Sequence, residues 1–331
     1  MNTTQQDLAI LENLSLKKKS FFNEISKVIV GQEEILNQIF IALLSQGHTL
    51  LVGVPGLAKT KLVQTLSKVL SLSFKRIQFT PDLMPSDITG TELIDIDQNT
   101  GQRSFRFHKG PIFANLVLAD EINRTPPKTQ AALLEAMQEH KVTTGGKSLN
   151  LDEPFFVLAT QNPIEQEGTY PLPEAQLDRF MFNLNIDYPS QKDEISIVRA
   201  TTTNQSKILN PIMNKEDLIS FQNLVKKVPI SDNVVEYAVK IVNATRPQSK
   251  QSPDFIKQSI DWGAGPRASQ YLVLGAKAKA ALDGNPTPSI HDINSLILPI
   301  LRHRVLPNFN AEAEGLKIED ILSQLIDNFS K

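Results

Sequence analysis

A glycine-rich segment that runs directly into a lysine and a threonine suits the binding of phosphate groups. Residues 53–60 read Gly-Val-Pro-Gly-Leu-Ala-Lys-Thr. Backbone N–H groups of such a loop point inward around phosphate oxygens, and the N-terminus of the helix that follows adds positive potential. Lys59 is predicted to reach the β- and γ-phosphates of a nucleotide, and the Thr60 hydroxyl to ligate Mg²⁺. The alternative is a Gly/Pro turn before a lysine-rich helix start.

Ala58 departs from the usual loop pattern, in which the position before the lysine is a glycine. We therefore expect the loop to tolerate one methyl group there. A short apolar strand predicted at residues 48–52 and a helix predicted at residues 59–70 supply the context that a phosphate loop requires. The residues predicted to contact the nucleotide here are Gly53, Val54, Pro55, Gly56, Leu57, Ala58, Lys59, Thr60 and Lys61.

Two carboxylates end an uninterrupted apolar strand. Residues 116–121 read Leu-Val-Leu-Ala-Asp-Glu, and such a run is typical of a strand buried in a parallel sheet. Open α/β sheets bind ligands at the carboxyl ends of their strands. Asp120 is predicted to hold Mg²⁺ through water, and Glu121 to act as the general base on the attacking water. An acidic pair at a strand end also arises by chance, so this interpretation depends on the preceding phosphate loop.

An amide follows the next buried strand, predicted at residues 155–159 beside the acidic one. This residue, Asn162, is predicted to hold the attacking water or to contact the γ-phosphate. The alternative is an Asn-Pro turn with Pro163. Without the phosphate loop and the acidic pair, the turn would be the better interpretation.

Two arginines carry the remaining chemistry. Arg179 suits an arginine finger, which stabilises charge on a phosphoryl group in transfer, and at a subunit edge it would serve the neighbour's ATP. Its alternative is a surface ion pair with Asp178 or Glu174. Arg267 opens a predicted helix and could contact the γ-phosphate; its alternative is an exposed residue at a helix start.

The elements around these residues change character along the chain. Strands alternate with helices up to about residue 188, and helical patterns dominate afterwards, which predicts an α/β domain at 1–188 and a helical domain at 189–331. Two alternating segments, residues 92–97 and 103–108, are predicted to pair around a turn at residues 100–101.

Composition excludes several classes of function. The chain of 331 residues has a net charge of −2, which argues against bulk nucleic-acid binding. It has no cysteine, so disulfides, thiolate metal sites and cysteine nucleophiles are excluded. No apolar run approaches the ~20 residues of a membrane span, and the N-terminus lacks a signal-peptide core. We expect a cytoplasmic protein.

In this order the motifs resemble those of the AAA+ ATPases. Residues 53–60 are similar to Walker A, residues 116–121 to Walker B, Asn162 to sensor 1, Arg179 to the arginine finger and Arg267 to sensor 2. The spelling of the phosphate loop, its alanine included, is similar to that of the MoxR family. Other similar segments are residues 120–130, 135–139, 159–163, 172–180 and 265–268. The resemblance extends from about residue 30 to residue 303.

The resemblance implies a P-loop NTPase core of three αβα layers with a parallel sheet, followed by an all-α lid, and an ATPase that uses ATP and Mg²⁺. It implies an insertion in the second helix of the core, at about residues 87–108, and an adenine pocket lined by Val30, Gly31 and Gln32. It also implies a homo-oligomer, as a hexamer, that acts as a chaperone on a client protein. Partners with a von Willebrand factor A domain would be separate polypeptides.

The remaining candidate residues receive plainer interpretations. The five histidines have no metal-ligand spacing. Trp262 is predicted to pack in the core or at a domain interface. Arg302, His303 and Arg304 are interpreted as a solvated helix end rather than a basic patch.

Four functions compete at this point. The leading one is a mechanical ATPase that remodels, matures or activates a client. A small-molecule P-loop kinase would need no finger from a neighbour and no helical lid. A nucleic-acid motor or transcription regulator conflicts with the near-neutral charge. A nucleotide-gated adaptor with slow turnover leaves Glu121 unexplained.

Overall fold

The computed structural model describes residues 3–96, 103–144, 146–165, 168–202 and 207–330. At its centre is a five-stranded sheet in the order β2-β5-β8-β1-β9. Its strands are β1 (His48–Val52), β2 (Phe74–Gln78), β5 (Leu116–Asp120), β8 (Phe156–Gln161) and β9 (Phe180–Asn185). All neighbouring strands are parallel, so their carboxyl ends meet at one edge.

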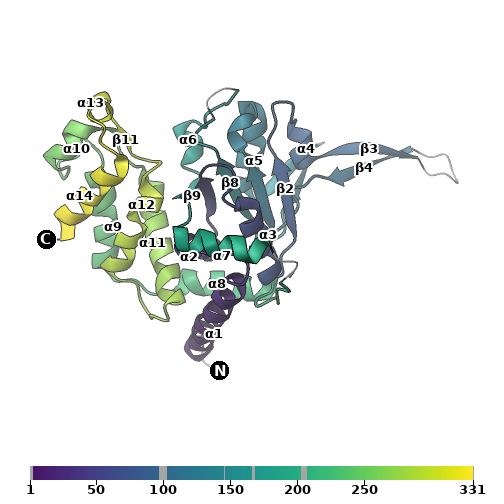
Figure 1. Ribbon diagram of the computed structural model, residues 1–331, viewed down its shortest axis with the longest axis horizontal. Helices are drawn as coiled ribbons and strands as arrows, with labels where there is room; N and C mark the ends of the chain where they lie inside the picture. The colour runs from purple at the N-terminus through teal and green to yellow at the C-terminus, as the bar shows by residue number, and fades with distance from the viewer. Residues whose placement is uncertain (1–2, 97–102, 145, 166–167, 203–206, 331) are drawn as a thin grey trace.

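Helices cover both faces of this sheet, which gives the three-layer αβα core (Figure 1). Side chains of β5 alternate: Leu116 and Leu118 pack toward one face, and Val117 and Ala119 toward the other. The first face is covered by α2 (Glu33–Leu44) and α3 (Lys59–Val69), and the second by α4 (Pro85–Thr89), the 3₁₀ turn η1 (Ile122–Arg124) and α5 (Pro127–Glu139). Because strands buried on both faces must be apolar throughout, these runs were readable from the sequence.

Two hairpins extend from the core. The larger pairs β3 (Gly90–Ile96) with β4 (Arg103–Lys109) and projects far from the sheet (Figure 1). It follows α4 within the insertion predicted at about residues 87–108; the turn predicted at residues 100–101 lies outside the described residues. The smaller hairpin, β6 (Lys141–Thr144) with β7 (Lys147–Asn150), was not predicted. A short helix, α6 (Glu174–Leu177), precedes β9.

The chain after β9 is mainly helical and includes the lid. Its helices are α7 (Gln191–Thr201), α8 (Lys215–Lys227), α9 (Asp232–Ala244), α10 (Asp254–Ser259), α11 (Pro266–Leu282), α12 (Ile290–Leu301), α13 (Phe309–Ala313) and α14 (Ile318–Ser330). A small antiparallel ribbon, β10 (Ile260–Trp262) with β11 (Leu306–Pro307), joins them. Reciprocal capping boxes begin two of these helices: Asn214 with Asp217 begins α8, and Ser289 with Asp292 begins α12.

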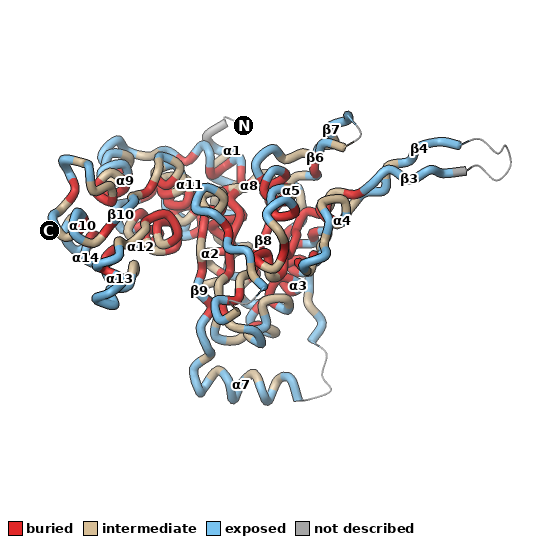
Figure 2. Tube along the Cα trace, turned by 90° about the horizontal axis from the view of Figure 1, so that it is seen from above, coloured by how far each residue is buried: buried red, intermediate tan, exposed pale blue. Residues whose placement is uncertain are grey.

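The lid and the core share one apolar interior, as the continuous buried band in Figure 2 shows. The N-terminal helix α1 (Thr3–Ile25) joins it and packs beside the lid helices α8 and α11. Lys18 on α1 forms an ion pair of 2.7 Å with Asp283 of the lid. Among the described residues, no helix is both long and apolar enough to cross a membrane.

Two predictions about the lid are wrong. Trp262 was expected in the core or at a domain interface, but it is 66% exposed on the short ribbon strand β10. His303 and Arg304 were expected at a solvated helix end, but both are buried, with 6% exposed. The Arg304 guanidinium donates to the carbonyl oxygens of Asp178 and Phe180 at 2.9 and 2.6 Å, and these long-range partners offset the cost of burying its charge.

Candidate functional site

The predicted phosphate loop connects the carboxyl end of β1 to the N-terminus of α3. The Lys59 ammonium lies inside it and donates to the carbonyl oxygens of Gly53 and Val54. Burial lowers the pKa of Lys59, and the nearby carboxylates of Asp120 and Glu121 act in the opposite direction. The loop lysine, the predicted metal ligand Asp120 and the predicted general base Glu121 therefore share one electrostatic environment.

The backbone conformation of the phosphate loop explains why small residues occupy it. At Gly53 a Cβ atom would lie 2.7 Å from the carbonyl oxygen of Ile186, so a side chain there would clash with the backbone. Gly56 has φ +90°. Ala58 has φ 56° and ψ 24°, in the left-handed region, which costs an alanine about 1–2 kcal/mol. The methyl group is tolerated, as predicted, although it stands in a conformation that favours glycine.

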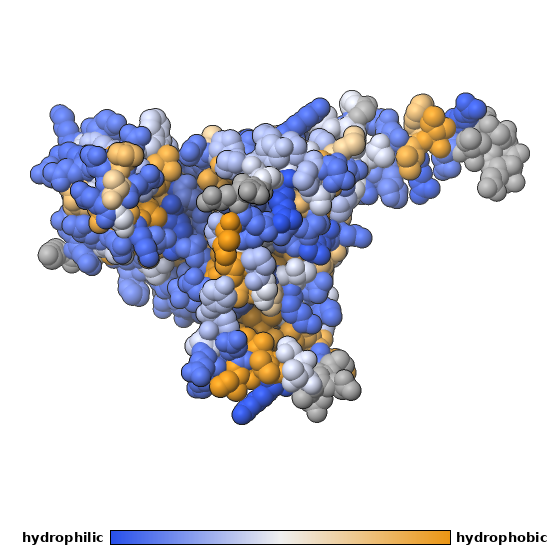
Figure 3. Space-filling view, turned by 45° about the horizontal axis from the view of Figure 1, so that its top comes forward, coloured by the Kyte–Doolittle hydropathy of each residue, from blue (hydrophilic) through white to orange (hydrophobic). Residues whose placement is uncertain are grey.

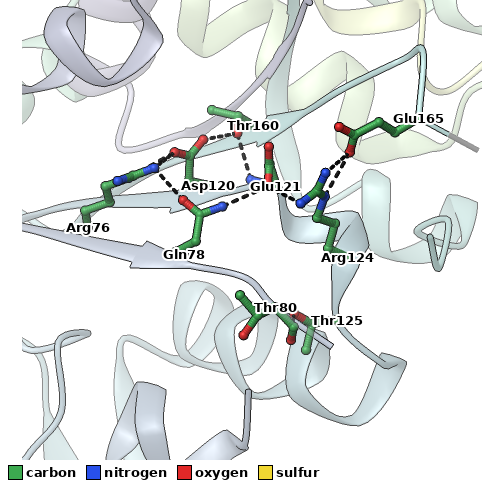
Figure 4. Close-up of polar contacts among 9 residues, drawn as sticks. All are labelled: Arg76, Gln78, Thr80, Asp120, Glu121, Arg124, Thr125, Thr160 and Glu165. Carbon is green, nitrogen blue, oxygen red and sulfur yellow. Dashed lines mark hydrogen bonds and ion pairs between the residues drawn. The ribbon is translucent and has the colours of Figure 1, made fainter. Parts of the chain in front are cut away.

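Asp120 is held from two sides at the carboxyl end of β5 (Figure 4). The Thr160 hydroxyl on β8 donates to its Oδ1 at 2.6 Å. The Arg76 guanidinium on β2 donates to its Oδ2 from Nε at 3.0 Å and from Nη2 at 2.6 Å. Since a carboxylate has about four lone-pair positions, Asp120 keeps accepting capacity for a metal-bound water.

Glu121 directly follows the strand with φ 59°, a strained conformation for a residue with a side chain. Gln78 on β2 donates from Nε2 to the Glu121 carboxylate at 2.8 Å. Arg124 reaches the same oxygen at 3.2 Å and also forms an ion pair of 2.5 Å with Glu165. The Glu121 carboxylate is therefore oriented by an amide on one side and a cation on the other (Figure 4).

Asn162 directly follows β8, the neighbour of β5, as expected. Its side chain is buried, with 5% of the residue exposed, and its Oδ1 accepts from the Ile164 N–H at 3.2 Å. The pKa of Glu165 is lowered mainly by its hydrogen bond with Arg124, and a hydrogen bond with Asn162 acts in the same direction. Asn162, Glu165, Arg124 and Glu121 thus form one polar chain.

The residues predicted to line an adenine pocket lie beside the phosphate loop. The Gln32 amide donates to the carbonyl oxygen of Leu57 at 3.4 Å. Gly31 has φ +75°, and a Cβ atom there would lie 2.8 Å from the side chain of Asp193 on α7. Val30 precedes them on the same segment. The start of α7 therefore flanks this side of the loop.

Arg179 lies at the opposite end of the sheet. It directly precedes β9, whose first residue Phe180 pairs in parallel with His48, the first residue of β1. The phosphate loop follows the last residue of β1, Val52. At about 3.3 Å per residue, the strand alone separates the two ends by roughly 13 Å. The Arg179 side chain is directed to α5, where it donates to the Leu134 carbonyl oxygen at 2.8 Å.

Arg267 lies at this opposite end as well. Its guanidinium forms an ion pair of 2.8 Å with Asp178, which also accepts from Arg304 at 2.7 Å. The ion pair expected as the alternative for Arg179 is not found with Asp178, which pairs with Arg267 and Arg304 instead. Arg267 does lie at the start of α11 with a side chain 39% exposed, but it is held by Asp178. The structure brings the two predicted phosphate-binding arginines together, but away from this chain's own phosphate loop.

Sequence reasoning missed Arg76, Gln78, Arg124, Thr160 and Glu165. The strand at 74–79 was predicted, but the roles of Arg76 and Gln78, two residues apart, become visible only once the register is known. That register places Gln78 opposite Asp120 and Arg76 opposite Leu118. Among the described residues, no cluster of three or more His, Cys, Asp or Glu side chains could hold a metal ion.

Comparison with known proteins agrees with the ATPase motifs described above. The family model "ATPase family associated with various cellular activities (AAA)" matches residues 48–182, and the AAA lid domain model matches residues 255–325. The chain is 41% identical to the chaperone MoxR1 of Mycobacterium tuberculosis over 92% of its own length and 79% of the relative's. It is 45% identical to the uncharacterised protein YeaC of Bacillus subtilis, over 91% of each chain.

A solved structure has the same fold. The crystal structure of an ATPase candidate from Cytophaga hutchinsonii superposes with a TM-score of 0.91 and 42% identity, covering 98% of this chain and 97% of that one. The two family models, the identity to MoxR1 and this fold agree with the motifs built above. The chain belongs to the MoxR family of AAA+ ATPases.

Proposed function

We propose that this ATPase binds ATP with Mg²⁺ at the carboxyl edge of the sheet and hydrolyses it at a site completed by a second subunit. Residues 53–61 surround the phosphates, with Lys59 as their cation. Val30, Gly31 and Gln32 lie on the adenine side, next to the start of α7. This assignment is supported by the hydrogen bond between Gln32 and Leu57, which links the two segments.

The residues present fit a magnesium ion. Mg²⁺ prefers oxygen ligands and keeps several waters, so it needs only one or two protein groups besides phosphate oxygens. The Thr60 hydroxyl and the Asp120 carboxylate are such groups, and no dedicated three-residue cage is required. When bound, the ion neutralises charge that develops on the phosphate oxygens. Arg76 and Thr160 hold the Asp120 carboxylate in place.

Glu121 and Asn162 act on the attacking water in this proposal. Glu121 accepts its proton as the general base, and the hydrogen bond from Gln78 fixes the carboxylate on the side of the β2 strand. Asn162 holds the water from the adjacent strand. The left-handed backbone at Glu121 is the kind of strain that collects at functional sites.

A single observation carries the shared site: Arg179 and Arg267 lie at the amino end of the sheet, while the phosphate loop lies at its carboxyl end. Neither arginine contacts its own loop. If they serve hydrolysis, as we propose, they serve the ATP of an adjacent copy. Contacts that run from one end of a subunit to the other end of the next are heterologous, and they form a ring when the rotation between subunits closes. We propose a hexamer on this basis and on the family resemblance.

We further propose that ATP turnover remodels, matures or activates a client protein in the cytoplasm. The relative MoxR1 is named a chaperone. The projecting hairpin exposes Leu93, Ile94 and Phe105, which are 52, 58 and 76% exposed, and Figure 3 shows hydrophobic side chains gathered along it. Exposed apolar groups of this kind suit transient contact with another protein. A separate protein with a von Willebrand factor A domain is one such partner.

A capture experiment tests the client. The Glu121→Gln variant would be held with ATP and Mg²⁺ in lysate of its own host, and retained molecules identified. Its matched control, Glu121→Gln combined with Lys59→Ala, lacks the phosphate cation. We expect proteins that the first variant retains and the control does not. Retention of nucleic acid without protein would favour a nucleic-acid motor, and no ATP-dependent retention would favour a nucleotide-gated adaptor.

A further inference from the structure

The helix α7 is the most weakly embedded helix of comparable length in the described chain. None of its residues is buried. Figure 2 shows it at the periphery, apart from the packed helices and strands, with an exposed segment leading to it. An amphipathic helix normally buries its apolar stripe against its own domain, and α7 does this only in part.

Two sides of α7 face different surroundings. Asp193, Ile197 and Ala200 are half-buried at helical spacing and form the side toward the body. Ile195 and Val198, three residues apart on another side, are 47 and 53% exposed. Hydrophobic side chains gather at this end of the molecule in Figure 3. The helix therefore presents an apolar side for which this chain supplies no partner among its described residues.

The position of α7 indicates what that partner is. The helix follows the carboxyl end of β9, so it begins at the same sheet edge as the phosphate loop. Asp193 in its first turn lies next to Gly31 of the predicted adenine segment, where an added Cβ atom would come within 2.8 Å of the Asp193 side chain. In the proposed shared site, this edge receives the second copy that brings Arg179 and Arg267. A client protein bound here would compete with that copy for space.

We propose that the outward side of α7, defined by Ile195 and Val198, packs against the adjacent subunit of the same chain. The inference rests on the proposed shared site. It adds that the contact which brings the neighbour's arginines to the phosphates also covers α7. Because Asp193 of the same helix lies next to the adenine segment, α7 links the nucleotide site to the subunit contact.

The absence of cysteine from the chain makes a direct test possible. An Ile195→Cys variant in the Glu121→Gln background would be labelled with a dye that reports solvent polarity. Assembly with ATP and Mg²⁺ would be followed by mass in analytical ultracentrifugation, and dye emission would be recorded across the same concentrations. We expect a blue shift that rises together with the assembled fraction. The control is Ile94→Cys on the hairpin, a similarly exposed isoleucine, which should show no shift.

A second variant measures the contribution of the contact. Ile195→Asp with Val198→Asp places two charges on a helix without buried residues, so the fold should be retained, and circular dichroism would check this. We expect the concentration for half-assembly to rise roughly tenfold or more, because burying an isoleucine or valine contributes on that scale. The matched control, Leu93→Asp with Ile94→Asp, should leave assembly unchanged.

The outcomes separate the two proposals. If the Glu121→Gln protein does not assemble with ATP, the shared site itself is wrong. If it assembles, but the dye at residue 195 does not shift and the double aspartate variant assembles normally, the shared site stands and the role of α7 is overturned.

Discussion

The two ends of the central sheet hold their charged groups in different ways. At the carboxyl end, two non-glycine residues, Ala58 and Glu121, adopt left-handed backbone conformations, and the carboxylates are held by groups from β2 and β8. At the amino end, Arg304 and His303 are buried, and their partners are the backbone around Asp178 and Phe180. Left-handed non-glycine residues also precede β1 and β2, at Gln46 and Ser71, so backbone conformation alone does not distinguish the two ends. The difference lies in the charged groups: carboxylates held by neighbouring strands at the first end, and a buried arginine held by backbone carbonyl groups at the second.

The two ends of the sheet therefore suit different roles in the function we propose. The carboxyl end has the features of a site that must change partners during a reaction. At the amino end, Asp178 holds Arg267 at 2.8 Å, with a side chain 39% exposed. In the function we propose, an arginine held at the far end from its own phosphate loop delivers its charge to another subunit.

Arg267 and Arg304 both pair with the Asp178 carboxylate, but replacing each with alanine should have different consequences. This is the largest expected effect. Arg267→Ala should lower kcat about 10³-fold, the lower end for phosphate-stabilising arginines, with little change in melting temperature, because an exposed ion pair contributes at most ~1 kcal/mol. Arg304→Ala should lower the free energy of unfolding by about 3–5 kcal/mol, since it removes a buried charge and leaves Asp178 Oδ1 and buried carbonyl groups without their donor. Steady-state ATPase assays and thermal denaturation measure both. Equal effects on both readouts would remove the distinction.

Acid should also lower the stability of the protein through His48, which lies at the amino end of the sheet. Its Nδ1 accepts from the Val157 N–H at 3.0 Å, and burial lowers its pKa to about 4. The folded pKa lies below the unfolded value near 6.5, so the neutral ring's contribution to stability is complete above pH 6.5 and is lost as pH falls toward 4.

Between those pH values we expect the free energy of unfolding to fall by about 3 kcal/mol from this group. His303, whose pKa burial also lowers, adds a loss of the same sign. Urea unfolding at several pH values measures the slope. His48→Gln, which cannot titrate, should flatten it, and an unchanged slope in that variant would contradict the assignment.

At the carboxyl end, Gln78→Ala removes the hydrogen bond that orients Glu121. Hydrogen bonds to charged groups contribute about 1.5–3 kcal/mol, so we expect kcat to fall roughly tenfold or somewhat more while the affinity for ATP is retained. Nucleotide titration and turnover assays separate the two. A weakened ATP affinity with normal kcat would place Gln78 in binding and not in orientation.

The smallest expected effect is a change in stability at the phosphate loop. Ala58→Gly relieves the left-handed strain, but it also adds freedom to the unfolded chain, so the net gain in unfolding free energy should be ~1 kcal/mol or less. Thermal denaturation measures it. A loss of stability would mean that the methyl group makes a favourable contact which outweighs its strain.

The sequence predicted what local patterns encode. The apolar run ending in Asp120 and Glu121, and the Gly-rich turn before Lys59, were readable because period and punctuation are local properties. The αβα core and the helical lid follow from the order of such elements. The positions of the phosphate loop, the acidic pair and Asn162 at neighbouring strand ends follow from the parallel sheet.

The features that could not be predicted from the sequence depend on strand register and on long-range packing. Arg76 and Gln78 became visible as partners of the carboxylates only through the pairing of β2 with β5. Arg304 looked like a solvated residue because its partners lie more than a hundred residues earlier in the chain. Trp262 looked like core because tryptophan usually is, yet it lies exposed on a ribbon.

The central claim is that one catalytic site takes Lys59 and Arg179 from different subunits. Lys59→Ala protein should fail to bind ATP, Arg179→Ala protein should bind it without turnover, and each alone should be inactive. An equal mixture should recover roughly a quarter of the wild-type turnover, the fraction of contacts that pair an intact loop with an intact arginine in a randomly mixed ring. Arg179→Ala mixed with the Lys59→Ala/Arg179→Ala double variant is the control and should stay inactive. Co-assembly of the two single variants without any recovery, at any ratio, would contradict the account.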